Sequence, residues 1–146
     1  MRRTLPLRLV LLVAPVLSAC VAATSEQPLE LAVSRYNQGL RWKRLTSASE
    51  LVVPERRSEF VRRYLAHEDD LHIENIEVRA VNRVEGEATP TFDVTVVAEA
   101  YLMPSTVLEK TIITERWQRR EGGWQLVKAE PELVPAPMDK ASASEP

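Results

Sequence analysis

The sequence predicts an α+β domain in which N-terminal helices pack against one face of a four-stranded antiparallel sheet. Two observations predict this fold class. Between residues 29 and 65, apolar residues recur at the spacing of an amphipathic helix. Between residues 71 and 130, the period changes to two, which is typical of half-buried strands, and Gly-containing turns follow two of these strands. We therefore expect one domain over residues 29–130.

Residues 1–19 have the features of an export signal. Arg2, Arg3 and Arg8 supply a basic start, and Leu9–Leu17 forms an apolar run that ends at small residues. The run is well short of the roughly 20 residues that a membrane-spanning helix needs. A cleaved leader is therefore favoured over a transmembrane anchor.

The leader ends in Leu17-Ser18-Ala19-Cys20, which resembles the lipobox of bacterial lipoproteins. The resemblance implies cleavage before Cys20, acylation of that cysteine and a lipid-anchored protein of the cell envelope. Val21, in place of Asp, favours the outer membrane by the same analogy, with the domain in the periplasm. The alternative is that Cys20 is an incidental residue of a signal peptide. Residues 20–28 are interpreted as the lipidated cysteine and a flexible tether.

The charge of the chain excludes one broad class of function. Three of the 19 basic residues lie in the leader and none of the 21 acidic residues do, so the chain after residue 19 carries a net charge of −5. A mildly acidic domain is not a general nucleic-acid binder. Because Cys20 is the single cysteine, the domain has no intrachain disulfide and its stability must come from packing.

Three helices are predicted, the first over residues 29–44. Gly39 inside it costs roughly 1 kcal/mol relative to Ala, which indicates a close approach of another segment. Ser47 and Glu50 have the spacing of a capping box for a short second helix. Pro54 suits the first turn of a third helix. The apolar faces of the first and third helices are formed by Leu29, Ala32, Val33, Tyr36, Leu40, Phe60, Val61, Tyr64 and Leu65.

The helical region is rich in basic residues, and two interpretations remain open. A basic face could turn toward anionic lipid or cell-wall polymer. A solvated surface with pairs at i,i+4, such as Glu59 and Arg63, is the favoured interpretation. The basic side chains are Arg41, Lys43, Arg44, Arg56, Arg57, Arg62 and Arg63.

Four strands are predicted after the helices, and the strand ending at Leu102 is the clearest. Asp93 and Glu99 are expected on its outward face. The inward face is expected to carry Phe92, Val94, Val96, Ala98, Ala100 and Leu102. That face offers no titratable group for acid–base catalysis, which argues against an enzyme.

The remaining strands are predicted at Ile73–Val84, Val107–Arg119 and Trp124–Ala129. A shift in apolar parity indicates a β-bulge near Val81. Residues 131–146 are rich in Pro, Ala and Ser and are interpreted as a disordered tail.

The order of these elements resembles the nuclear transport factor 2-like (NTF2-like, SnoaL-like) superfamily. The resemblance rests on the helical run that holds Tyr36, Leu40, Trp42, Pro54 and Phe60, and on the closing hairpin from Trp117 through Gly122-Gly123 to Trp124. It implies a strongly bent sheet that forms a cone around the helices. It also implies a homodimer through the outer sheet face, where Val97, Tyr101 and Trp117 are expected. The alternative is that the helices or the tail cover these strands.

The functional hypotheses follow from what the inward face lacks. We favour a non-enzymatic binding or structural module, with Tyr36, Trp42 and Tyr64 as a possible pocket for a small apolar ligand; core packing is the alternative role of these three. A small enzyme of isomerase or hydrolase type remains the alternative function. His67 and His72 lie five residues apart and not on one helical face, so no metal site is expected. No catalytic residue and no cofactor is predicted.

Overall fold

The computed structural model describes residues 27–136, which form three helices and one four-stranded sheet. The helices are α1 (Leu29–Arg41), α2 (Leu45–Ser49) and α3 (Pro54–Leu65). The strands are β1 (Leu71–Arg83), β2 (Thr91–Leu102), β3 (Glu109–Arg120) and β4 (Gly123–Glu130), in the order β1-β2-β3-β4. All neighbours are antiparallel, which confirms the α+β prediction and the meander.

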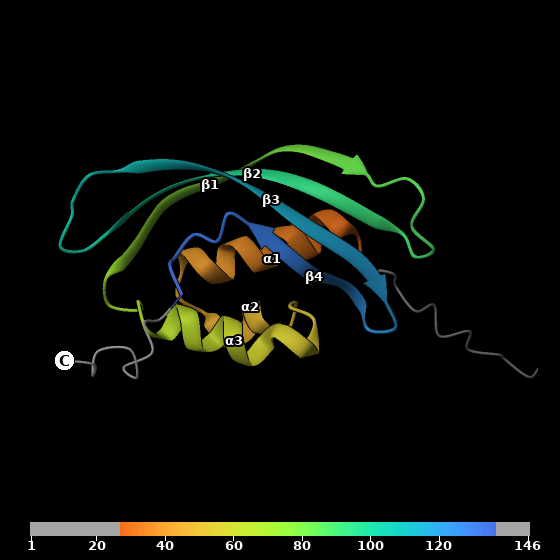
Figure 1. Ribbon diagram of the computed structural model, residues 1–146, viewed down its shortest axis with the longest axis horizontal. Coiled ribbons are helices and arrows are strands. Elements are labelled where there is room, and N and C mark those ends of the chain that lie inside the picture. The colour runs from red at the N-terminus through yellow and green to blue at the C-terminus, as the bar shows by residue number, and fades with distance from the viewer. Residues whose placement is uncertain (1–26, 137–146) are drawn as a thin grey trace, which may run out of the picture.

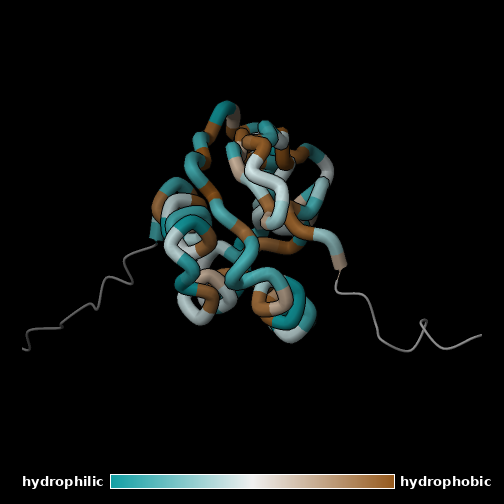
Figure 2. The backbone as a smooth tube through the Cα atoms, turned by 90° about the vertical axis from the view of Figure 1, so that its left-hand side faces the viewer, coloured by the Kyte–Doolittle hydropathy of each residue, from teal (hydrophilic) through white to brown (hydrophobic). Residues whose placement is uncertain are grey.

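The sheet arches over α1, and α2 and α3 lie on the side of α1 away from the arch (Figure 1). Figure 2 views the helices nearly end-on, and hydrophobic and hydrophilic residues alternate around their turns. This alternation is the expected signature of helices that bury one stripe and expose the other. The core therefore sits between one face of the helices and the concave face of the sheet.

A close contact between α1 and α2 fixes how these two helices pack. A Cβ atom added at Gly39 would lie 2.9 Å from the Cβ of Ala48, so the prediction of close packing at Gly39 is confirmed. The predicted capping box is wrong, because Ser47 lies inside α2 and Glu50 follows its last residue. The contact with Gly39 places α2 over Leu45–Ser49, and this tertiary constraint overrides the local capping signal.

Helix α3 begins at Pro54, as predicted, because proline's missing N–H leaves no intrahelical bond unmade in the first turn. Phe60 and Tyr64 face the core, while Leu65 is exposed. The guanidinium of Arg63 donates to the Glu59 carboxylate at 2.7 Å, which confirms the predicted i,i+4 pair.

Strand β2 presents the face that its alternation predicts. Val94, Val96 and Ala98 are fully buried. Strand β1 contains two register shifts against β2, between Ile73 and Asn75 and between Val78 and Ala80. The bulge predicted at Val81 is therefore present slightly earlier in the strand.

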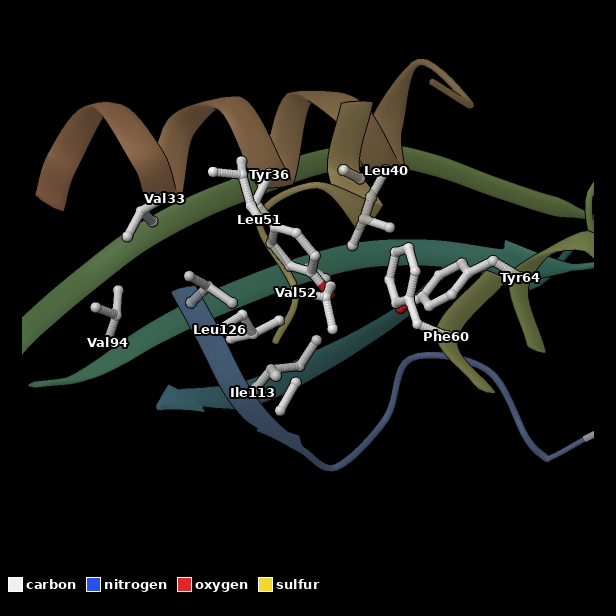
Figure 3. Close-up of a cluster of buried hydrophobic side chains, with 14 of the residues drawn as sticks. Val33, Tyr36, Leu40, Leu51, Val52, Phe60, Tyr64, Val94, Ile113 and Leu126 are labelled. Carbon is white, nitrogen blue, oxygen red and sulfur yellow. The ribbon is translucent and has the colours of Figure 1, made fainter. Parts of the chain in front are cut away.

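Aromatic rings form the centre of the core (Figure 3). The Tyr36 ring meets the Trp117 ring edge-on, with 5.8 Å between centroids, and lies 5.9 Å from the Phe60 ring. Phe60 in turn lies 4.8 Å from Tyr64. Rings at these separations add about 0.5–1.5 kcal/mol per pair beyond the area they bury.

The chain continues to pack after β4. Val134 is buried in the core, and Arg56 donates to the Glu132 carboxylate at 3.0 Å. The domain therefore extends beyond the predicted boundary at residue 130, and the first part of the predicted tail is ordered. Residues 137–146 lie outside the described part of the chain.

Candidate functional site: a valine-lined pocket

A pocket of about 210 Å³ lies between α1 and strands β1 and β2. We call it the valine pocket. Its apolar wall is formed by Leu29, Val33, Ile76, Val78, Val81 and Val94. Its polar lining comes entirely from α1 and consists of Glu30, Ser34, Asn37 and Gln38. An aliphatic wall with a few convergent polar groups is the usual composition of a small-molecule site.

The geometry of β1 explains why this pocket exists. β1 is an edge strand, so Val78 and Val81 face inward without a further strand beside them, and they are 46% and 44% exposed. The register pairs Val78 with Val96 and Val81 with Val94, so the shift between Val78 and Ala80 keeps both valines on the concave face. The bulge therefore widens the apolar wall of the pocket along the strand.

Asn37 is the buried polar group of the valine pocket. Its side-chain N–H donates to the Val33 carbonyl at 3.1 Å, and its amide lies near enough to Glu115 to lower the pKa of that acid. The amide orientation follows from the Val33 partner, because a carbonyl can only accept. Asn37 thus links the pocket to a buried acid on β3.

Glu115 is that acid, and it is only 2% exposed. Its carboxylate accepts a hydrogen bond from the Trp117 indole N–H at 2.9 Å. Burial raises the pKa of Glu115 from its ordinary 4.5 to about 7, against the lowering effect of the hydrogen bonds from Trp117 and Asn37. Desolvation dominates because the charged form loses water that two donors replace only in part.

Glu115 is the residue that sequence analysis missed. The inward face of β2 is free of titratable groups as predicted, but β3 places Glu115 on the same face, opposite Val94 in the register. The alternation of Ile113, Glu115 and Trp117 carried the signal, since a buried Trp117 requires that Glu115 also points inward. Placing Trp117 on the outer face hid both residues.

The predicted pocket of Tyr36, Trp42 and Tyr64 does not form. Tyr36 and Tyr64 are buried in the aromatic core, whereas Trp42 is 58% exposed. The Trp42 indole donates to Gln38 at 2.8 Å, and Arg41 lies over its ring. Burial raises the pKa of both tyrosines above the ordinary value, so they remain neutral packing groups. Helix α1 ends at Arg41, which turns Trp42 away from the core.

The proposed dimer face also requires a correction. Trp117 is fully buried on the concave face, so it is not part of the outer surface. Val97 and Tyr101 do face outward, where Tyr101 stacks on His72 at 4.8 Å between centroids. Charged pairs flank them, including Arg116 with Asp93 at 2.8 Å and Lys110 with Glu99 at 2.8 Å. The hydrogen bond from Arg116 lowers the pKa of Asp93.

Within residues 27–136, no group of three or more His, Asp, Glu or Cys side chains is placed to hold a metal ion. His67 follows α3, and His72 lies in β1 against Tyr101. No helix in this part of the chain is long and apolar enough to cross a membrane. Cys20 and the leader lie outside the described residues.

Comparisons with known proteins identify a structural neighbour and no family. No family model matches the chain, and no curated protein matches it. Among solved structures, the chain is similar to the solution structure of a SEC-C motif-containing protein from Rhodopseudomonas palustris. The TM-score is 0.55, the sequence identity is 13%, and the match covers 70% of this chain and 77% of the other. At this identity the likeness concerns the fold alone.

This neighbour corrects the resemblance drawn from the sequence. The matching structure is that of a SEC-C motif-containing protein and not an NTF2-like domain, so the assignment to an NTF2-like domain is wrong. None of the comparisons supports the lipobox. The physical reason is that the quoted motifs report packing: Tyr36, Phe60 and Trp117 fill the core, and Gly123 supplies a turn with φ +116. Such features serve any sheet that covers helices, so they do not identify one superfamily.

Proposed function

We propose that this chain is a non-enzymatic binding module that holds a small apolar ligand in the valine pocket. The observation that carries the proposal is the aliphatic wall of the pocket, which includes the half-exposed Val78 and Val81. Exposed apolar side chains that converge on a hollow are a common mark of a ligand site. An apolar cavity of roughly 150 Å³ already accommodates benzene, so 210 Å³ suits a small ligand.

Titration of the isotope-labelled full chain with n-hexanol tests the proposal. We expect the methyl resonances of Val33, Val78 and Val81 to shift together and to saturate. Val78→Phe fills the pocket and is expected to weaken binding at least about tenfold, which corresponds to about 1.4 kcal/mol. Val107→Phe is the matched control, because Val107 is also exposed but lies at a different hollow, beside Tyr101. Equal binding by both variants would exclude the valine pocket.

Glu115 supports a second candidate function, a small enzyme of isomerase or hydrolase type. A carboxyl with a pKa of about 7 is suited to general acid–base catalysis at neutral pH. The burial of Glu115 argues for a structural role, because a catalytic group must reach its substrate. Turnover of ester and enol substrates, measured for the native chain and for Glu115→Gln, distinguishes the two roles. Turnover by the native chain that the variant loses would favour the enzyme.

The location of the protein is a separate proposal that rests on the leader sequence alone. We propose export to the envelope and attachment to a membrane through Cys20, with the domain in the periplasm. Cys20→Ala is expected to move the exported protein from the membrane fraction to the soluble fraction. Retention of this variant in the membrane fraction would contradict attachment through Cys20.

A further inference from the structure

The chemistry of the polar lining defines the ligand class of the valine pocket more closely. This inference rests on the proposed binding function. It starts from the donors and acceptors that α1 presents. Ser34 follows Glu30 by four residues, and Asn37 and Gln38 follow Ser34 by three and four, so the four side chains form one stripe along the helix.

At the buried end of the stripe, Asn37 offers an acceptor. Its side-chain nitrogen donates to the Val33 carbonyl at 3.1 Å, which fixes the orientation of the amide. The amide oxygen only accepts, so a polar ligand group that reaches this oxygen must donate a hydrogen bond.

At the open end of the stripe, the charge of the lining also favours a ligand group that donates hydrogen bonds. Glu30 is the one formally charged side chain that lines the valine pocket, and it is exposed at the first turn of α1. Ser34 adds a hydroxyl that can accept or donate. No basic side chain lines the pocket in the described part of the chain. An anionic head group would thus meet Glu30 without a compensating cation.

The wall sets the other half of the ligand. All six apolar lining residues are aliphatic, and three of them are valines of the sheet. Aliphatic side chains offer no ring for stacking, so they select by shape and apolar area alone. A volume of 210 Å³, somewhat above that of a benzene-sized cavity, fits a short alkyl chain.

We propose that the valine pocket binds a short aliphatic amine, with the alkyl chain among the valines and the ammonium group on the acceptors of α1. The ammonium donates three hydrogen bonds and carries the charge that complements Glu30. One feature of the site opposes this choice. The free N–H groups at the start of α1 attract anions, so a carboxylate is the relevant competitor.

The test compares three probes of equal chain length at pH 6, where the amine and the acid are both ionised: n-hexylamine, n-hexanol and hexanoate. Kd is measured for each from the valine methyl shifts of the full chain. We expect hexylamine to bind tightest and hexanoate at least about fivefold more weakly. Glu30→Gln is expected to weaken hexylamine about two- to fivefold, as for an exposed ion pair, and to leave hexanol unchanged. Glu50→Gln, an exposed acid that does not line the pocket, is the control.

Each outcome bears on one of the two proposals. Tightest binding of hexylamine with a selective loss in Glu30→Gln supports the ligand class. If hexanol binds and hexanoate binds as tightly as hexylamine, the preference for an amine is overturned. The proposed binding function then stands. Binding of none of the three overturns the binding function itself. Equal losses of hexylamine affinity in Glu30→Gln and Glu50→Gln would show long-range electrostatic attraction instead of a contact with Glu30. This result would also overturn the proposal.

Discussion

Helix α1 separates two regions that differ in how completely they are packed. Toward α3, β3 and β4, its Tyr36 meets Phe60 and Trp117 in a filled aromatic core. Toward β1, its Val33 faces the pocket bounded by Val78. In Figure 3, Val33 and Val94 lie at the end of the cluster away from Phe60 and Tyr64.

The difference arises at the two edges of the sheet. The outer edge of β4 is covered by the segment between α2 and α3, because Val53 donates to the Leu126 carbonyl at 3.0 Å and Leu126 donates to the Leu51 carbonyl at 2.7 Å. The edge at β1 has β2 as its sheet neighbour and carries two register shifts. A covered edge completes the core, whereas an open edge leaves inward-facing side chains available to a ligand. The filled core and the pocket therefore lie toward opposite edges of the sheet.

The largest expected loss of stability follows from a substitution in the aromatic core. Trp117→Ala removes a fully buried ring and its contact with Tyr36, and we expect a loss of about 3–5 kcal/mol in the free energy of unfolding. Denaturant unfolding measures it. Ile112→Ala, on the outer face of the same strand and 63% exposed, should change stability by less than about 0.5 kcal/mol. Equal losses at the two positions would contradict the assigned faces of β3.

The next largest effect concerns the buried acid Glu115. Because the folded-state pKa of Glu115 is about 7 and its ordinary value is 4.5, the folded state binds the proton more tightly. Its favourable contribution is complete below pH 4.5 and is lost as the pH rises to about 7. The difference amounts to about 3 kcal/mol. Glu115→Gln is expected to flatten this part of the stability profile between pH 4.5 and 8, and an unchanged slope would assign the dependence to other groups.

A smaller effect tests the contact that positions α2. Gly39→Ala brings two methyl groups to 2.9 Å, which should cost about 1–3 kcal/mol, offset in part by the roughly 1 kcal/mol by which Ala favours a helix over Gly. Thermal unfolding measures the net change. Adding Ala48→Gly makes room for the new methyl group, so the double variant should recover the loss that arises from crowding. Absence of recovery would place the strain elsewhere.

The smallest effect on stability belongs to the open edge. Val81→Ala removes two methyl groups from a side chain that is already 44% exposed, so the free energy of unfolding should fall by less than about 1 kcal/mol. Its affinity for n-hexanol should nevertheless fall measurably, because Val81 forms part of the pocket wall. A large loss of stability without a change in affinity would mean that the β1 edge belongs to the core.

Much of the fold could be predicted because local patterns carried it. The alternation along β2 placed Val94 and Val96 correctly, since period two admits one buried face when only one face is apolar. Strand β3 has apolar residues on both faces, Ile112 outside and Ile113 inside, so its parity was ambiguous from sequence. That ambiguity misplaced Trp117 and concealed Glu115.

The candidate site was less accessible to sequence reasoning. Its wall combines Val33, Ile76 and Val94 from three elements, and its width depends on a bulge whose position local parity located only approximately. The aromatic residues proposed for a pocket were instead separated by the end of α1 at Arg41, which left Trp42 in solvent.

By itself, the sequence determined the order of helices and strands, the antiparallel meander and the buried face of β2, because helical and strand periods and turn residues act over a few positions. Only the tertiary structure decided which face of β3 is buried, how far the chain packs after β4 and where a pocket opens. Those features depend on contacts between distant segments, such as Asn37 with Glu115 and the closure of one sheet edge but not the other.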